Sequence, residues 1–320
     1  MQRFLRVVVA MMLTGSILSA CSEEPPPPQS SVDDVDVTGL NLKADIDRDS
    51  WMITLPADRF GISRDEEDII SSAYMGASMT CYKKYAPDQI WVDLPPLSGL
   101  NAMNPPVFSE FGVWRVGMAQ QFGFDAPATA RIPIAGRSDV RTPISREVVA
   151  KVYKDRAAIP TDVFEKAVAS CEDDPDIQKF KNPYELVIAP WWDEINQARA
   201  KLFDYDAARQ IYNDVASCFE SEGLKMAEEG FGGVENFDFR RKKNNPYPAK
   251  KEIDIALKVA QCQEKFDATP KLAEILAEKQ ADIIKKYPNE FVSGRQKIDA
   301  LVADAKQYIQ EHPDVYVKTN

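Results

Sequence analysis

The chain has 320 residues, of which 44% are hydrophobic and 10% aromatic, proportions typical of a folded globular protein. It carries 39 lysines and arginines against 50 aspartates and glutamates, a net charge of −11. This acidic balance argues against a nucleic-acid-binding protein and against broad docking on anionic lipid.

The first 20 residues have the three parts of a secretory signal peptide. Arg3 and Arg6 supply a positive start, a short apolar run follows, and small residues precede Cys21. The run is too short to span a bilayer, which takes about 17–25 residues. Residues 18–21 are Leu-Ser-Ala-Cys, which resembles the bacterial lipobox. We therefore predict a lipoprotein signal peptide at 1–20, lipidation of Cys21 with acyl chains such as palmitate, and anchoring to the extracytoplasmic face of the cell membrane. The alternative is an ordinary signal peptide followed by a chance cysteine.

Residues 21–50 are predicted to be a disordered linker between the anchor and a folded domain. Pro25–Pro28 favours a stiff, extended spacer, and Val32–Asp49 is acidic and too polar to pack. We divide the rest of the chain into an N-terminal helical half with proline-rich loops, residues 51–187, and a C-terminal helical half, residues 188–320.

Apolar residues recur at helical spacing in the N-terminal half. They predict helices over residues 64–85, 113–122, 145–154 and 162–173, separated by loops rich in proline. Asp162 and Glu165 stand in the positions of a capping box at the start of the last of these helices.

The C-terminal half contains longer helical patterns with little proline. They predict helices over residues 191–203, 206–222, 250–266, 271–286 and 289–310. A polar, glycine-rich connection is expected over 223–248. The helix at 250–266 is apolar on opposite sides, which indicates a buried helix. The expected fold class is mainly α, with long irregular loops.

Four cysteines besides Cys21 lie on or beside the apolar stripes of predicted helices: Cys81, Cys171, Cys218 and Cys262. An even number in an exported protein indicates two disulfides, with buried free thiols as the alternative. No Cys-x-x-Cys pair is present, so these cysteines do not predict a metal site. The simplest pairing joins neighbours within each half, Cys81 with Cys171 and Cys218 with Cys262. Four cysteines allow three pairings, and the other two stay open.

Three segments carry a resemblance to a known family: Phe111–Phe124, Cys218–Gly223 and Lys251–Cys262. They resemble segments of an uncharacterised family of actinobacterial secreted lipoproteins with paired cysteine helices. The chain departs from the family pattern with Phe219 where methionine is usual and with Gln261 near usual charged positions. The resemblance implies a helical fold, disulfides and an envelope location, and it implies no known activity.

The sequence contains no motif that points to catalysis, a metal or a cofactor, so we predict a non-enzymatic protein. Its single histidine, His312, precedes Pro313 and is expected to be solvated or to cap a helix. Glu66 and Glu67 are interpreted as solvated charges. The acidic cluster Asp173–Asp176 lacks the glycine and glutamate of a calcium loop.

Two groups of residues could bind components of the cell envelope. Trp191 and Trp192 could stack on the sugar rings of a wall glycan, although a helix start that buries one indole explains the pair as well. The second group could dock on anionic lipid or wall polymer, with a solvated loop as the alternative. It comprises Phe237, Phe239, Arg240, Arg241, Lys242 and Lys243.

Together these features predict a membrane-anchored lipoprotein with a non-catalytic binding or scaffold domain. The expected partners are membrane lipid through Cys21 and an envelope protein or wall glycan, and not nucleic acid. A solute-binding lipoprotein of a transporter is the first alternative. An envelope hydrolase is the second, disfavoured by the single histidine and the lack of a motif.

Overall fold

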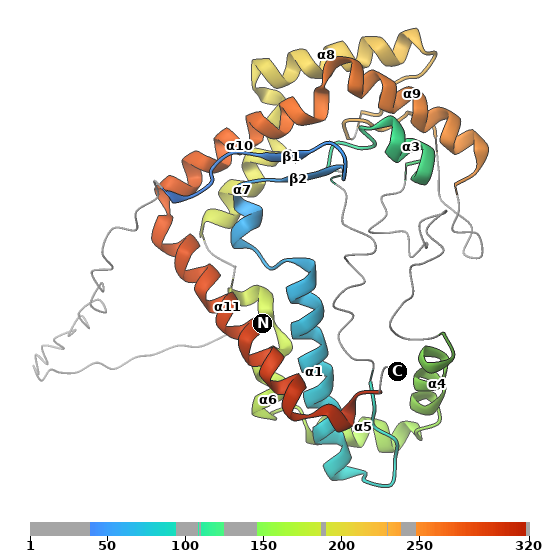
Figure 1. Ribbon diagram of the computed structural model, residues 1–320, viewed down its shortest axis with the longest axis vertical. Helices are drawn as coiled ribbons and strands as arrows, with labels where there is room; N and C mark the ends of the chain where they lie inside the picture. The colour runs from blue at the N-terminus through green and yellow to red at the C-terminus, as the bar shows by residue number, and fades with distance from the viewer. Residues whose placement is uncertain are drawn as a thin grey trace, which may run out of the picture. The chain divides into compact units, whose positions relative to one another are not determined.

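The structure is a computed structural model that describes residues 39–93, 108, 110–124, 146–186, 190–228, 230–237 and 248–317. All of them belong to one compact unit, Val35–Asn320. The predicted signal peptide, Cys21 and the proline-rich part of the linker lie outside the described residues. The fold is mainly helical, as predicted (Figure 1).

The elements are two short strands, ten α-helices and four 3-10 helices within the described residues. The strands are β1 (Asp45–Asp47) and β2 (Met52–Thr54). The α-helices are α1 (Arg64–Tyr85), α3 (Val116–Phe122), α4 (Arg146–Ala157), α5 (Thr161–Ser170), α6 (Pro175–Lys181), α7 (Pro190–Ala200), α8 (Asp206–Ser221), α9 (Lys250–Phe266), α10 (Ala268–Lys286) and α11 (Pro288–Glu311). The 3-10 helices are η2 (Ala57–Phe60), η3 (Pro183–Leu186), η4 (Leu202–Asp204) and η5 (Pro313–Val315).

Most predicted helices are present, with differences at their ends. Helices α1 and α9 have the predicted bounds, whereas α10 begins three residues before the predicted Lys271. Pro270 lies in the first turn of α10, where a proline removes no intrahelical hydrogen bond. Helix α6 was not predicted, because it is short and begins inside an acidic segment.

The capping box predicted at Asp162 and Glu165 is wrong. Helix α5 begins one residue earlier, after Pro160, and has no side-chain cap. A capping box occurs instead at the start of α1. There the backbone N–H of Ser63 donates to Glu66 Oε2 (2.8 Å), and that of Glu66 donates to Ser63 Oγ (3.4 Å).

The end of the predicted disordered linker is ordered. From Gly39 onward the chain is described, and β1 pairs with β2 in an antiparallel hairpin that places Ile46 opposite Ile53. Leu40 and Leu42 pack against a cluster that contains buried Ala57 and Phe60. Apolar residues at alternate positions thus give this acidic segment one face that can be buried.

Helices α1 and α11 lie side by side and run parallel, although they belong to different predicted halves (Figure 1). Near their starts, Arg295 Nη2 donates to Glu66 Oε1 (2.6 Å). At their ends, Lys83 Nζ lies 2.9 Å from Asp314 Oδ2. Helices α5 and α6 pack against the same α1 and build a core around buried Ile177 and Phe180. Glu66 is therefore part of an ion pair between helices and not only a solvated charge.

A second group of helices surrounds α9. Helix α3 packs antiparallel on α9, and two carboxylates of α9 hold its ends. The backbone N–H of Val116 donates to Glu264 Oε1 (2.8 Å), and the N–H of Phe124 donates to Glu252 Oε1 (3.2 Å). Gly123 makes the second contact possible, because a Cβ there would lie 2.3 Å from Glu252 Oε1. A seven-residue helix with few bonds of its own is thus held at both ends by its neighbour.

Both disulfides have the predicted pairing. Cys81 of α1 is bonded to Cys171, directly after α5, with 6.0 Å between the Cα atoms. Cys218 of α8 is bonded to Cys262 of α9, with 5.7 Å between the Cα atoms. Each bond joins helices that are separated by a long connection in the sequence.

Removal of either disulfide should lower stability by about 4 kcal/mol, because the bonds close loops of 90 and 44 residues in the unfolded chain. The variants are Cys81→Ala/Cys171→Ala and Cys218→Ala/Cys262→Ala, and the measurement is urea denaturation without reductant. Equal midpoints for the wild type and both variants would contradict the stabilising role.

The C-terminal segment packs across α1 through Tyr316. Its hydroxyl donates to the carbonyl of Ser72 (2.8 Å), and its ring is buried against Gly76. A Cβ at position 76 would lie 2.0 Å from Tyr316 Oη. Glycine at this place in the middle of a helix therefore has a packing reason.

Gly76→Ala is expected to destabilise the protein by about 1–3 kcal/mol, because the added methyl group displaces Tyr316. Gly294→Ala is the matched control in α11. Its nearest neighbour would be an atom 3.8 Å away, so a gain of up to about 1 kcal/mol is expected from helix propensity. Thermal unfolding of both variants checks this. The loss of stability caused by Gly76→Ala should vanish when Tyr316 is also replaced by alanine.

Candidate functional site

The candidate site is a pocket of about 450 Å³ beside the Cys81–Cys171 disulfide. It lies between α1, α5 and α6, and its walls come from segments about 80 to 110 residues apart in the sequence. The lining residues are Tyr74, Tyr82, Phe164, Glu165, Val168, Ala169, Cys171, Glu172, Ile177 and Lys181. Its volume falls in the range of about 300–1,000 Å³ typical of small-molecule sites.

The floor of the pocket is aromatic and aliphatic. Tyr82 and Phe164 have ring centroids 6.0 Å apart, and both pack against buried Trp91. The indole N–H of Trp91 donates to the carbonyl of Ala86 (2.8 Å), which fixes this cluster to the end of α1. Val168, one turn after Phe164 on α5, is 39% exposed. The pocket thus offers apolar surface to solvent beside a rigid aromatic cluster.

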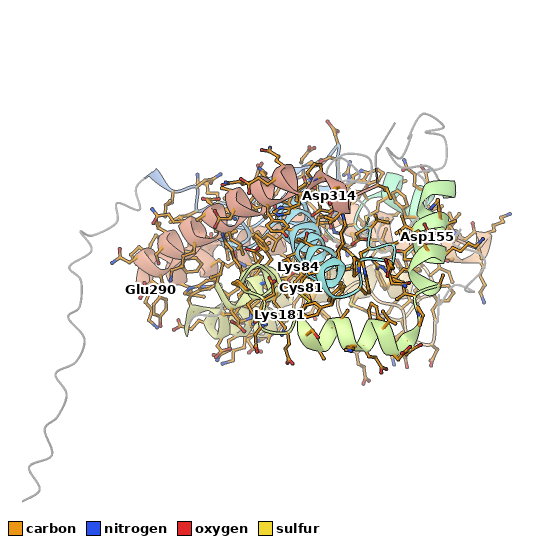
Figure 2. All side chains as sticks on the ribbon, turned by 90° about the horizontal axis from the view of Figure 1, so that it is seen from below. Cys81, Lys84, Asp155, Lys181, Glu290 and Asp314 are labelled. Carbon is orange, nitrogen blue, oxygen red and sulfur yellow. A yellow bond between two sulfur atoms is a disulfide. The ribbon has the colours of Figure 1, made fainter. Side chains whose placement is uncertain are left out.

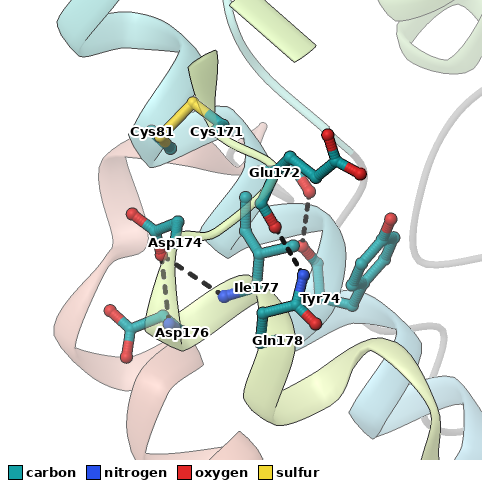
Figure 3. Close-up of a disulfide and its surroundings, with 9 residues drawn as sticks. Tyr74, Cys81, Cys171, Glu172, Asp174, Asp176, Ile177 and Gln178 are labelled. Carbon is teal, nitrogen blue, oxygen red and sulfur yellow. Dashed lines mark hydrogen bonds between the residues drawn. A yellow bond between two sulfur atoms is a disulfide. The ribbon is translucent and has the colours of Figure 1, made fainter. Parts of the chain in front are cut away.

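The turn from α5 to α6 shapes one side of the pocket (Figure 3). Asp174 Oδ1 accepts from the backbone N–H groups of Asp176 (3.0 Å) and Ile177 (3.3 Å), and so caps α6. The side-chain amide of Gln178 donates to the carbonyl of Glu172. The acidic cluster at 173–176 is therefore a helix cap.

Three charged side chains also line the pocket. Glu165 and Glu172 carry carboxylates, and Lys181 carries an ammonium group. All three are exposed, and none forms an ion pair with another described residue. Figure 2 labels Lys181, which is the last residue of α6, and Cys81 of α1, the helix on which α6 packs. Burial raises the pKa of the Tyr82 phenol, so its hydroxyl stays neutral well above physiological pH.

The sequence did not reveal this pocket. Phe164, Ala167, Val168 and Cys171 lie on one face at helical spacing. The structure buries Ala167 and Cys171 but leaves Val168 open to solvent. The available signal was Phe164 and Val168 one turn apart on a short amphipathic helix, with Glu165 beside Phe164. Whether such a stripe is covered depends on α6, which the sequence did not predict.

The predicted tryptophan pair is divided between core and surface. Trp191 is 3% exposed and stacks on Phe291, with ring centroids 4.1 Å apart. Trp192 is 42% exposed and meets Trp191 edge to face. One buried indole at a helix start was the stated alternative, and only Trp192 of the two is accessible to a glycan.

Trp191→Ala should destabilise the fold by about 3–5 kcal/mol, because it empties the space against Phe291. Trp192→Ala should change stability by less than about 0.5 kcal/mol. Chemical denaturation of the two neighbouring variants measures this contrast. Equal effects would contradict the assignment of Trp191 to the core.

The basic loop lies mostly outside the described residues, including Phe239 and the run Arg240, Arg241, Lys242 and Lys243. Phe237 is described. It packs against Phe124, with ring centroids 5.5 Å apart, so it contacts the residue that follows α3. Its partly buried ring is anchored to the protein and does not project freely.

His312 caps the end of α11, one of its two expected roles. Its ring stacks on Tyr308 at 4.0 Å between centroids, and Nδ1 lies 3.0 Å from the carbonyl of Tyr308. Among the described residues, no cluster of three histidine, cysteine or acidic side chains could hold a metal ion. No helix in the same part of the chain is long and apolar enough to cross a membrane.

The chain matches no protein-family model, no curated protein and no solved structure. The resemblance to actinobacterial secreted lipoproteins therefore stays a prediction. Its three segments do come together in space. Helix α3 packs on α9, and the Cys218–Cys262 bond joins α8 to α9.

Proposed function

We propose that the chain is a lipoprotein anchored through Cys21 to the extracytoplasmic face of the cell membrane. Its helical domain serves there as a non-catalytic binding or scaffold module. Its partners are membrane lipid, through the anchor, and a component of the envelope, either a protein or a wall glycan. The signal-peptide pattern and the Leu-Ser-Ala-Cys sequence at 18–21 support the anchor.

The observation that carries the proposal is the division of the five cysteines. Cys81, Cys171, Cys218 and Cys262 pair with one another, so Cys21 belongs to neither disulfide. Disulfides persist in oxidising compartments, which agrees with export. The cysteine left over stands where the lipobox places the lipidated residue.

The pocket beside Cys171 supports a binding role for the domain. The first alternative, a solute-binding lipoprotein of a transporter, draws less support. Such receptors usually alternate strands and helices in two lobes, whereas the strands of the described residues are the three-residue β1 and β2. The second alternative is a hydrolase. His312 does not support it, because its ring stacks on Tyr308 at the end of α11.

Cys21→Ser should abolish incorporation of radiolabelled palmitate and should move the chain from the membrane fraction to the soluble fraction, because the thiol that carries the lipid is lost. Ser22→Ala is the matched control and should keep both properties. Labelling and fractionation of cells that express each variant check this.

Palmitate on the Cys21→Ser chain would contradict the proposed anchor. So would a wild-type chain found, after signal cleavage, entirely in the soluble fraction. If the anchor is present, crosslinking of the wild-type protein in the same membranes identifies the envelope component that it contacts. Cys21→Ser serves as the reference in this experiment.

A further inference from the structure

The pocket between α1, α5 and α6 combines two properties that together specify a ligand. Its floor is formed by Tyr74, Tyr82 and Phe164, with Val168 and Ile177 beside them. At about 450 Å³ it suits a small molecule with an apolar body, not a bare ion. Tyr82 and Phe164 pack on buried Trp91, so this part of the floor is formed before a ligand arrives.

The charges that line the pocket favour a positive ligand. Glu165 and Glu172 contribute two carboxylates, and Lys181 contributes one opposing ammonium. The faces of aromatic rings also attract cations, by about 0.5–2 kcal/mol according to desolvation. Since none of these charged groups is paired within the described residues, the carboxylates are available to a ligand.

We infer that this pocket binds a small amphipathic organic cation. Its apolar body lies on the floor of Tyr74, Tyr82 and Phe164, and its ammonium group lies at the rim near Glu165 and Glu172. The inference rests on the proposed function, since it names a ligand class for the binding domain. It does not depend on the anchor, because binding to the pocket requires no lipid on Cys21.

Three probes that share one carbon skeleton separate the contribution of the apolar floor from that of the charges at the rim. They are 4-phenylbutylamine, 4-phenylbutan-1-ol and 4-phenylbutyrate, which are positive, neutral and negative at pH 7. Isothermal titration calorimetry on the purified full chain should show the amine binding about three- to tenfold more tightly than the alcohol, and the carboxylate most weakly. The advantage of the amine should shrink in 1 M salt, because the exposed charges of Glu165 and Glu172 are screened.

Substitutions in the pocket assign the effect to named residues. Glu165→Gln/Glu172→Gln should abolish the advantage of the amine and leave the alcohol unaffected. Lys181→Gln should strengthen amine binding about twofold, because it removes the opposing charge. Glu290→Gln, an exposed carboxylate on α11, is the control and should change nothing. Ala169→Trp fills the pocket from the exposed side of α5 and should weaken the amine and the alcohol alike.

Equal affinity for the three probes would overturn the inference, as would a preference for the carboxylate or failure of the amine to bind. Amine binding that survives Ala169→Trp in a folded protein, checked by circular dichroism, would place the site elsewhere and would also overturn it. These outcomes are independent of the palmitate experiment. Loss of the anchor with intact amine binding would reject the proposed location alone.

Discussion

The bond between Cys81 and Cys171 is the constraint on which the candidate site depends. It holds the end of α5 against α1, and α6 then starts four residues after Cys171 under the cap of Asp174. Without that covalent link, two helices of seven and ten residues would be held on α1 by packing alone, and short helices are marginal on their own. The walls of the pocket come from these helices. The shape of the pocket therefore depends on the disulfide between Cys81 and Cys171 as well as on helix packing.

The second disulfide supports a different part of the protein. Cys218–Cys262 joins α8 to α9, and α9 in turn holds α3 through Glu264 and Glu252. Two buried polar side chains in this core, Gln263 and Thr269, form hydrogen bonds. The amide of Gln263 donates to the carbonyl of Phe111 (2.6 Å), and Thr269 donates to Gln263 (2.9 Å). The segments that resemble the lipoprotein family lie in this core, so the resemblance concerns the framework and not the pocket.

The helices that could be predicted are those whose apolar spacing persists over several turns, such as α1 and α9. The β-hairpin and α6 were missed because each is short and lies in an acidic stretch, where composition suggested solvent exposure. Division of the chain at residue 187 followed proline content. The packing joins α1 to α11 and α3 to α9 across that division, within one compact unit. Proline content changes along the chain where loops are long. Helices, in contrast, pack on the neighbours with which their apolar faces must be buried.

The sequence by itself determined the helical fold class, the number of disulfides and the signal-peptide pattern, because periodicity, cysteine count and composition are local properties. It favoured the observed cysteine pairing without excluding the others. Tertiary structure alone decided that Trp191 is core and Trp192 is surface, that Glu66 pairs with Arg295, and that Val168 faces an open pocket. Each of these depends on which distant helix covers a given face. A residue's neighbours along the chain do not specify that partner, so the candidate site became visible only when α1, α5 and α6 were placed together.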